Sequence, residues 1–354
     1  MRRVSKLVAA VGTAAALAIT ATGCGSTSTE SSSPSSSSSD GKSKGIALAY
    51  DVGGRGDQSF NDAAYDGFEK ARQDFDIDGK DVEPSDGEAD ADKVQRLTEL
   101  AKQGYNPVIG VGFAYAPAVE KAAEKFPKTT FGLVDDSTVQ GDNIANLVFS
   151  EEQGSYLAGV AAAKATKTKV VGFVGGVEVP LIKKFEAGFV QGVKDTDDSI
   201  TVKRQYLTQP PNMDGFSKPD LGKEAARGQL DDKADVIYHA AGLAGQGVIE
   251  AVSAQDKWVI GVDSDQYTQK TLDAYKDNIL TSMTKDVSGA VYNLVKSVQD
   301  GKPLSGEIRF DLKSGGVGLS DSNPAYAKVS GLKDAVDKAR EAVVNGEIKV
   351  KDTP

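Results

Sequence analysis

Histidine and cysteine are nearly absent from this chain, which contains one of each among 354 residues. A His-rich metal site, a Cys-x-x-Cys motif and a disulfide bond all need more than that, so the composition excludes them. A Ser-His-Asp triad could use only His239, which ends an apolar stretch where a structural role is the commoner one. The phosphate-binding motifs G-x-x-x-x-G-K-[ST] and G-x-G-x-x-G are also missing. We therefore expect neither a metal nor a cofactor.

Positive charge is scarce as well, because 41 Lys and Arg face 51 Asp and Glu and the formal net charge is −10. Three of the cations, Arg2, Arg3 and Lys6, lie in a segment that we expect to be removed, which would bring the net charge to −13. Nucleic acids and anionic membrane surfaces both select for clustered Lys and Arg. We therefore expect no nucleic-acid partner.

The amino terminus has the pattern of an export signal. A basic start is followed by an apolar run, Leu7 to Ala21, which is too short to span a bilayer. Ala21-Thr-Gly-Cys24 then resembles a bacterial lipoprotein box, with Ala where Leu is commonest. We predict a lipoprotein signal peptide over 1–23 and lipidation of Cys24, which would hold the protein on the outer face of the cytoplasmic membrane. An ordinary secretory signal with an incidental cysteine is the alternative.

Between the predicted lipid site and the first strand, residues 25–44 consist mainly of Ser, Thr, Gly and Pro. Such a composition cannot bury enough apolar surface to order itself. A flexible coil of about twenty residues reaches roughly 25 Å on average. We therefore interpret 24–44 as a lipidated cysteine followed by a disordered, Ser-rich tether.

From Gly45 onward, short apolar strands alternate with amphipathic helices, the pattern of parallel sheets covered on both faces. The rhythm breaks near residue 148 and then restarts. We predict an α/β fold of two doubly wound lobes, the first made of 45–148 plus about 286–303, the second of 149–285 plus about 304–354. If the later elements cross back between the lobes, the hinge contains several strands; periodicity leaves that crossing open.

The loop Asp51 to Asn61, between the first strand and a helix, is the strongest candidate for ligand contact. In open α/β sheets ligands bind at the carboxyl ends of the strands. Asp51 and Asn61 offer hydrogen bonds, and Phe60 offers a flat apolar face. Ser59 with Asp62 three residues later resembles a capping box. The alternative is a plain strand-to-helix loop, which every α/β protein contains.

Other strands also end in polar or glycine residues, and they come from both predicted lobes. These candidates are Asp135, Gly242, Asp263 and Lys285, and Phe216 lies in a further polar loop. A single strand-end Asp is usually a cap or a turn, but several could converge on one cleft. Lys285 and Asp263 form either a buried ion pair or a donor and an acceptor for hydroxyl groups. Asp135-Asp136 or Asp263 with Asp265 could carry acid–base chemistry, although neighbours on a strand point to opposite faces.

Several blocks in one order carry a resemblance to a known family. They are Asp51-Val-Gly-Gly with Gln58-Ser-Phe-Asn61, Gln153-Gly-Ser-Tyr-Leu-Ala-Gly159, Val171-Gly-Phe-Val-Gly-Gly176, Lys184-Phe-Glu-Ala-Gly-Phe189, Ala234 to Gly242, Ile260-Gly-Val-Asp-Ser-Asp-Gln266 and Leu280-Thr-Ser-Met-Thr-Lys285. From about Gly45 to Gly318 the chain resembles the basic membrane protein family, lipoprotein solute-binding components of ABC importers that include purine nucleoside receptors.

The resemblance implies a type I periplasmic-binding-protein fold with three crossovers and a nucleoside held between the lobes. It implies that Phe60 and Phe216 sandwich the base, that Asp51, Asn61 and Asp135 bind mostly the base, and that Gly242, Asp263 and Lys285 bind the ribose. The inserted Gln209-Pro-Pro-Asn-Met213 departs from the family pattern near Phe216. It leaves the base preference open.

We therefore expect a non-enzymatic, membrane-tethered nucleoside-binding protein that closes around its ligand and delivers it to an ABC permease and its ATPase. A receptor for another neutral ligand, such as a sugar, is an alternative in the same class. A nucleoside-cleaving enzyme using Asp263 or Asp135 is an alternative in another class, and a surface sensor without an importer is a third.

Overall fold

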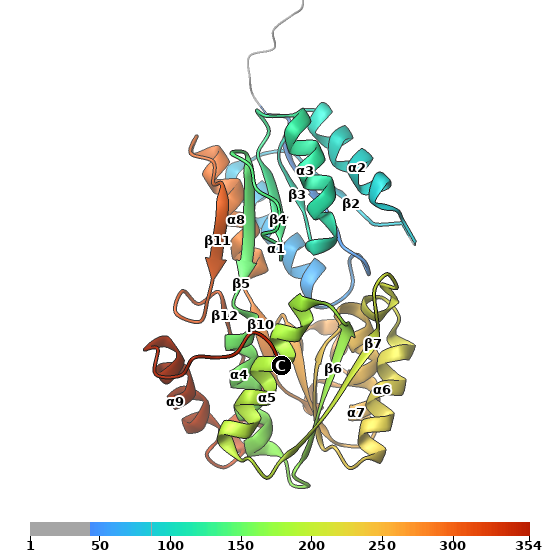
Figure 1. The fold of residues 1–354 in the computed structure, drawn as a ribbon, viewed down its shortest axis with the longest axis vertical. Helices are drawn as coiled ribbons and strands as arrows, with labels where there is room; N and C mark the ends of the chain where they lie inside the picture. The colour runs from blue at the N-terminus through green and yellow to red at the C-terminus, as the bar shows by residue number, and fades with distance from the viewer. Residues whose placement is uncertain (1–42, 86) are drawn as a thin grey trace, which may run out of the picture. The chain divides into compact units, whose positions relative to one another are not determined.

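The computed structural model describes residues 43–85 and 87–354, and Ser43–Pro354 forms one compact unit. The predicted signal peptide, Cys24 and nearly all of the predicted tether lie outside the described residues. Within the described part, no helix is both long and apolar enough to cross a membrane. The described chain contains two six-stranded sheets with helices around each, which confirms the predicted two-lobed α/β architecture (Figure 1).

The first sheet has the strand order β11-β5-β4-β3-β1-β2, and every neighbouring pair is parallel. Its strands are β1 (Gly45–Ala49), β2 (Gly79–Val82), β3 (Tyr105–Gly110), β4 (Phe131–Val134), β5 (Ile144–Phe149) and β11 (Gly306–Phe310). The helices of this lobe are α1 (Phe60–Phe75), α2 (Asp90–Lys102), α3 (Ala116–Lys125) and α8 (Val287–Gln299).

Side-chain alternation along the fully buried β1 explains why helices cover both faces of the first sheet. Ile46 and Leu48 belong to the apolar cluster that includes Phe68 of α1 and residues of α8. Ala47 and Ala49 belong to a separate cluster with residues of α2 and α3. Because successive side chains of a strand point to opposite faces, an apolar strand of this kind needs cover on both.

The second sheet has the order β12-β10-β9-β8-β6-β7 and is parallel except for β12, which runs antiparallel to β10. Its strands are β6 (Val170–Val177), β7 (Thr201–Thr208), β8 (Val236–Ala240), β9 (Trp258–Asp263), β10 (Ile279–Lys285) and β12 (Val317–Leu319). Its helices are α4 (Glu151–Ala165), α5 (Pro180–Thr196), α6 (Pro219–Asp231), α7 (Gly245–Ser253) and α9 (Leu332–Val344). Alternation along β8 again divides the core, since Tyr238 packs in the cluster with α4 and α5, and Ile237 in the cluster with α6 and α7.

Short 3-10 helices occupy several of the loops. They are η1 (Phe113–Tyr115), η2 (Asp214–Phe216), η3 (Gly242–Ala244), η4 (Gln266–Thr268), η5 (Lys270–Leu272), η6 (Lys276–Asn278) and η7 (Tyr326–Lys328). The first three directly follow β3, β7 and β8 or the turns after them. They therefore lie where the strands of each lobe approach the other lobe.

The described chain passes between the lobes three times: from β5 to α4, from β10 to α8, and from β11 to β12. The three crossings agree with the crossover number that the resemblance implied. The predicted division was wrong in one place, because it put about 304–354 in the second lobe. Residues Gly306 to Phe310 pair in parallel with β5 of the first lobe, and in this register Gly306 lies opposite Ala145. Only after β11 does the chain return to the second sheet.

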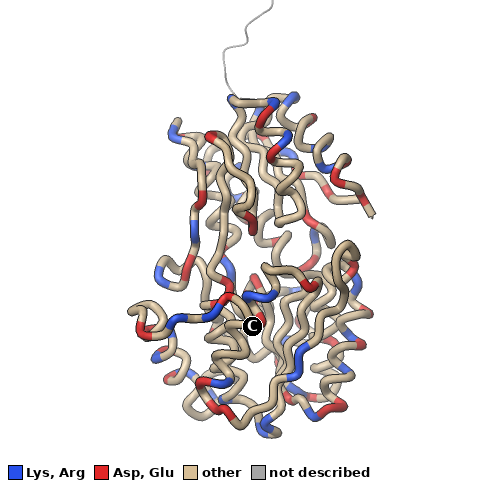
Figure 2. Tube along the Cα trace, viewed as in Figure 1, with Lys and Arg blue, Asp and Glu red and all other residues tan. Residues whose placement is uncertain are grey.

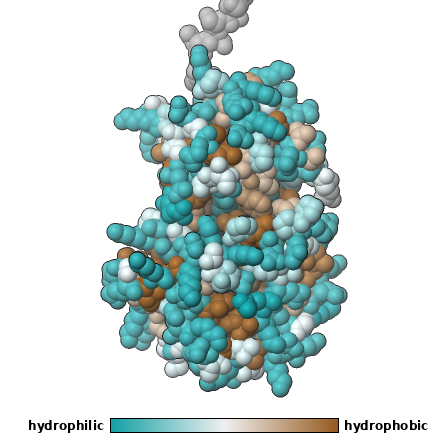
Figure 3. Space-filling model, in the orientation of Figure 1, coloured by the Kyte–Doolittle hydropathy of each residue, from teal (hydrophilic) through white to brown (hydrophobic). Residues whose placement is uncertain are grey.

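Charged residues of both signs are interspersed along both lobes in the view of Figure 2. The surface in the same orientation is mostly hydrophilic, and apolar side chains show at the waist where the two lobes meet (Figure 3). That waist is also where the strands of the two parallel sheets end. It is therefore the place to look for a ligand site.

Candidate ligand-binding cleft

One pocket lies between the lobes at the carboxyl ends of strands from both sheets, with an empty volume of about 530 Å³ including its opening to solvent. All eight sequence-predicted ligand residues line it: Asp51, Phe60, Asn61, Asp135, Phe216, Gly242, Asp263 and Lys285. The other lining residues are Val52, Asp57, Gly112, Phe113, Leu181, Ile182, Phe185, Ala240 and Val262.

The loop from β1 to α1 forms one wall, and its helix cap differs from the predicted capping box. The Ser59 side chain makes no cap hydrogen bond. Instead the buried Asp57 carboxylate accepts the backbone N–H groups of Asn61 at 2.8 Å and Asp62 at 3.2 Å. An aspartate at a helix amino terminus satisfies unpaired N–H groups and favours the helix dipole. The Ser59 hydroxyl is thereby free to act elsewhere.

Asn61 fixes the position of Asp51 within this wall. The Asn61 Oδ1 atom accepts the backbone N–H of Asp51 at 3.0 Å, and its Nδ2 donates to Asp57 at 3.2 Å. Asn61 is itself only 2% exposed, so its amide is committed to the loop. The residue therefore lines the pocket mainly as a support for the aspartate beside it.

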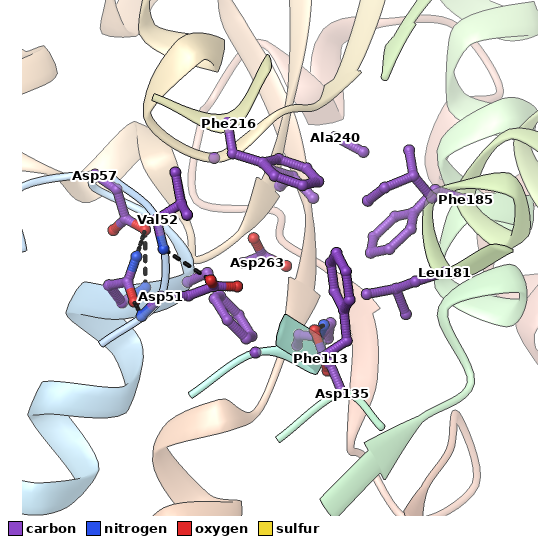
Figure 4. Close-up of a pocket in the computed structure, with 17 residues that line it drawn as sticks. Asp51, Val52, Asp57, Phe113, Asp135, Leu181, Phe185, Phe216, Ala240 and Asp263 are labelled. Carbon is purple, nitrogen blue, oxygen red and sulfur yellow. Dashed lines mark hydrogen bonds and ion pairs between the residues drawn. The ribbon is translucent and has the colours of Figure 1, made fainter. Parts of the chain in front are cut away.

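Asp51 is a buried carboxylate, and few hydrogen bonds or positive charges compensate for the cost of burying its charge. Its Oδ1 accepts one hydrogen bond, from the Val52 backbone N–H at 2.8 Å, as the dashed line in Figure 4 shows. Burial raises the pKa of Asp51 to about 7, and the Val52 N–H and the charge of Lys93 offset only part of that rise. An acceptor held in this way gains from any donor that a bound molecule brings to it.

Asp135 follows β4 and Asp263 is the last residue of β9, so the two lie in different lobes. Both have left-handed backbone conformations, with φ of 67° and 63°. Such conformations are uncommon outside glycine and concentrate at functional sites. The Oδ1 atom of Asp135 is buried without a hydrogen-bond partner in the described structure. Burial also raises the pKa of Asp263, although Lys285 and the Ser59 hydroxyl oppose it.

Lys285, the last residue of β10, is the cation of the pocket, and its side chain is 1% exposed. The sequence left open whether Lys285 and Asp263 form a buried ion pair or act as donor and acceptor for hydroxyl groups. The close ion pair of Lys285 is instead with Asp135, at 2.6 Å. The Nζ atom also lies 4.9 Å from the centre of the Phe60 ring. Burial alone would lower the pKa of Lys285, but Asp135, Glu151 and Asp263 together raise it above its ordinary value.

Aromatic side chains form the apolar part of the pocket. Phe60 and Phe216 both line it, and the rings of Phe113 and Phe216 point toward one another, with centres 6.4 Å apart at 69° (Figure 4). Phe185 of α5 and Leu181 beside it lie on the side away from Asp51 in the same view. Phe113 and Phe185 were not predicted from the sequence. A phenylalanine after Gly112, two residues beyond the end of β3, was a usable signal for Phe113, whereas Phe185 lies in an ordinary apolar stripe of α5.

Hydrogen bonds outside the pocket join the two lobes along the same loop. The Ser59 hydroxyl donates to the Asp263 carboxylate at 2.7 Å, and the Ser264 hydroxyl donates to the Ser59 carbonyl at 2.9 Å. Side-chain amides of the second lobe also reach this loop, Gln246 to the Gly56 carbonyl and Gln266 to the Gln58 carbonyl. The lobes are therefore held together beside the pocket in this structure.

The charge balance of the pocket is negative. Four carboxylates line it, those of Asp51, Asp57, Asp135 and Asp263, against the single ammonium of Lys285. Within residues 43–85 and 87–354, no group of three or more His, Cys, Asp or Glu is arranged to hold a metal ion. The pocket therefore offers hydrogen-bond acceptors together with phenyl rings, and little attraction for an anion.

Two further sequence expectations concern residues near the pocket. His239 is fully buried, bonds through Nε2 to the Gln266 side-chain oxygen at 3.1 Å, and has a pKa lowered by burial to about 4. It does not line the pocket, which agrees with the structural role predicted for it. None of the inserted residues Gln209 to Met213 lines the pocket either; they form the turn that leads to η2 and Phe216.

The fold and the interlobe pocket define the class of the protein as a two-lobed solute-binding protein of the periplasmic-binding-protein type. A crystal structure of an ABC transporter solute-binding protein from Aeropyrum pernix K1 superposes with a TM-score of 0.75 at 28% identity, covering 88% of this chain and 93% of that one.

The chain belongs to the family described as ABC transporter substrate-binding protein PnrA-like, also called Bmp, whose sequence profile matches residues 45–354. It is 36% identical to the CD4+ T-cell-stimulating antigen of Listeria monocytogenes over 87% of this chain and 88% of that one. It is 34% identical to the ABC transporter nucleoside-binding protein BmpA of Lactococcus lactis, over 86% of this chain and 88% of the relative. The family resemblance predicted from sequence is thus confirmed.

Proposed function

We propose that this protein is a lipid-anchored receptor that binds a nucleoside, with purine nucleosides preferred, between its two lobes and delivers it to an ABC permease. One observation carries the proposal. The eight positions that the resemblance assigned to a nucleoside, from distant parts of the chain, surround a single pocket between the lobes. The name of the Lactococcus lactis relative, a nucleoside-binding protein, points to the same ligand class.

The chemistry of the pocket suits an uncharged ligand that brings several donors and a flat ring. Asp51 carries a single hydrogen bond and Asp135 has a buried unpartnered oxygen. Buried acceptors without partners are costly, so a ligand that supplies N–H and O–H groups gains the most there. A base and a ribose supply both kinds of donor. The phenyl rings of Phe60 and Phe216 offer faces on which a base can stack.

The same charge balance argues against nucleotides. A phosphate would enter a pocket with four carboxylates and one ammonium, and that ammonium already lies 2.6 Å from Asp135. Like charges repel strongly at the reduced effective dielectric constant of a buried site. We therefore propose discrimination against nucleoside monophosphates by repulsion.

Closure would couple to the ligand, because Asp51, Phe60 and Asp135 belong to the first lobe and Phe216, Asp263 and Lys285 to the second. A ligand that touches both lobes binds the closed arrangement more tightly than the open one and shifts the population toward it. The permease could then distinguish loaded from unloaded receptor. Cys24 and the segment 25–44 would hold the domain at the outer face of the membrane within reach of that permease.

Titration calorimetry on the chain from residue 25 tests the ligand. Guanosine, inosine and adenosine are compared with uridine, free ribose and inosine monophosphate. Purine nucleosides should bind well below millimolar, while ribose and the monophosphate bind at least tenfold more weakly. Equal binding of nucleoside, ribose and monophosphate would refute the proposal, and tight binding of a sugar alone would favour the sugar-receptor alternative. Chromatography of the incubated nucleoside for released base tests the alternative of a cleaving enzyme.

A further inference from the structure

Glu151 is a buried carboxylate beside the pocket, and it is not among the ligand contacts described above. It is the first residue of α4, immediately after the first crossing between the lobes. Its side chain is 1% exposed, and its Oε1 lies 3.6 Å from the Nζ of Lys285. Lys285 is the last residue of β10, immediately before the second crossing. The two residues thus meet at the hinge, and Glu151 does not line the pocket itself.

The two carboxylate partners of Lys285 belong to different lobes. Asp135 follows β4 of the first lobe, whereas α4, which carries Glu151, packs on α5 and on β10 in the second lobe with Lys285. If the lobes part, Asp135 moves away with the first lobe and Glu151 stays. A buried ammonium that loses every counter-ion is strongly destabilised and turns toward solvent. Asp263 also stays in the second lobe but makes no ion pair with Lys285 in the described part of the chain, so Glu151 is the paired carboxylate that remains.

We propose that Glu151 is a positioning residue that keeps the Lys285 ammonium at the pocket wall whether the lobes are apart or together. This inference rests on the proposed function, because it assigns Lys285 a contact with the ligand. Glu151 acts only through Lys285. A lysine held in place before the ligand arrives loses less side-chain entropy on binding, so the role of Glu151 is preorganisation.

The surroundings of Glu151 support this role. Its second carboxylate oxygen, Oε2, lies 3.5 Å from the Nζ of Lys184 on α5, so both oxygens face cations. The charged groups around it are Lys285 on β10, Lys184 on α5 and Asp135 after β4. Burial is the largest influence on the pKa of Glu151 and raises it, Asp135 raises it further, and the two lysines offset only part of the rise. Acidification should therefore neutralise Glu151 and weaken its hold on Lys285.

The first test needs no ligand. The full-length protein, purified in detergent, is treated with an amine-methylating reagent, and methylation of Lys285 is followed by mass spectrometry of its peptide. Glu151→Gln should raise the methylation rate of Lys285 roughly tenfold, because losing the counter-ion both frees the amine and lowers its pKa. Glu152→Gln removes the same charge from the next residue of the same helix turn and is the matched control. Unchanged methylation in Glu151→Gln would overturn the inference.

The second test asks whether Glu151 acts through Lys285. Calorimetry with the best purine nucleoside should show affinity reduced roughly tenfold by Glu151→Gln and partly restored by Glu151→Asp. In a Lys285→Met background, Glu151→Gln should have almost no further effect, because the residue it positions is gone. Equal losses in both backgrounds would mean a general structural role and would refute the proposal. Circular dichroism confirms that each variant is folded.

The two experiments separate this inference from the proposed function. If the wild-type protein binds no nucleoside, the proposed function fails, while the methylation rates still decide whether Glu151 holds Lys285. If the wild type binds nucleoside and Glu151→Gln behaves like Glu152→Gln in both tests, only the inference about Glu151 fails.

Discussion

Asp51→Asn should stabilise the protein in the absence of ligand and weaken ligand binding at the same time. Asp51 is buried at the pocket wall with one hydrogen bond, and its pKa is raised to about 7 by burial. The ionised side chain is therefore unfavourable for the unliganded fold at pH 8. Asparagine has nearly the same shape and carries no charge, so it removes that cost. It also removes a carboxylate acceptor that we propose binds the ligand.

The pKa shift sets the size of the effect. A pKa near 7 instead of the ordinary aspartate value of 3.8 corresponds to about 4 kcal/mol, because one pKa unit is worth 1.36 kcal/mol. This is an upper bound, because water in the pocket and local relaxation reduce the cost of the buried charge. Because the folded pKa is the higher one, protonation of Asp51 favours the fold. Its stabilising contribution is complete below pH 3.8 and is lost as the pH rises through 7.

Urea unfolding at pH 5.5 and pH 8 measures the free energy of unfolding of wild type and variant. The difference in favour of Asp51→Asn should be about 1–3 kcal/mol at pH 8 and clearly smaller at pH 5.5. Nucleoside affinity should change in the opposite direction, rising from pH 5.5 to pH 8 in the wild type and staying flat in the variant. Asp142→Asn, a change at an exposed turn residue, is the control for a general charge effect.

Two outcomes would refute this reasoning. If Asp51→Asn is no more stable than the wild type at pH 8, the carboxylate is not the buried, poorly compensated group that the structure indicates. If the variant is more stable but binds nucleoside as well as the wild type at every pH, Asp51 is not a ligand contact.

Three further predictions concern the ring contact, the contact between lobes and the anchor. Phe60→Ala should weaken purine nucleoside binding by about 1–3 kcal/mol in calorimetry, the usual value of stacking on one aromatic ring. If the melting temperature instead falls as far as it does for a core substitution, the Phe60 ring belongs mainly to the core. Ser264→Ala removes the hydroxyl that donates to the Ser59 carbonyl of the other lobe. It should weaken ligand binding about fivefold, because one hydrogen bond contributes about 1 kcal/mol. Analogues altered in the ribose and analogues altered in the base should lose affinity equally, and a loss confined to one kind of analogue would contradict a role of Ser264 in closure. Cys24→Ser should release the protein from the membrane fraction, and unchanged sedimentation with membranes would exclude the lipid anchor.

Strands could be predicted from the sequence where both of their faces are buried, and could not where they are exposed. Strands that are buried along nearly their whole length, such as Ile144–Phe149 and Trp258–Val262, were recognisable because burial on both faces leaves a mostly apolar run. The edge strand β2 was missed, since Gly-Lys-Asp-Val is half exposed and has no apolar pattern. The lobe that contains β11 could not be predicted either. Its pairing with β5 joins residues far apart in sequence, and nothing in residues 306–310 specifies that partner.

The candidate site shows a similar division. The motif blocks led to eight residues that share one pocket, but they did not predict which of these residues form ion pairs with one another. Lys285 pairs with Asp135 across the lobes and not with Asp263, because the partner depends on how two separately folded sheets meet. Phe185 was not identifiable, since its place in the apolar stripe of α5 looks the same whether it faces a core or a cavity.

The exchange of roles between Asp57 and Ser59 has a consequence for how closure and binding are linked. Because Asp57 caps α1, the Ser59 hydroxyl can donate to Oδ2 of Asp263 in the other lobe. That bond both joins the lobes and restrains the Asp263 carboxylate, which lines the pocket. If the lobes separate, Asp263 loses this donor as well as the ligand. The contact that closes the cleft is thus also the contact that prepares an acceptor, and under the proposed function closure and ligand recognition would strengthen one another through a single carboxylate.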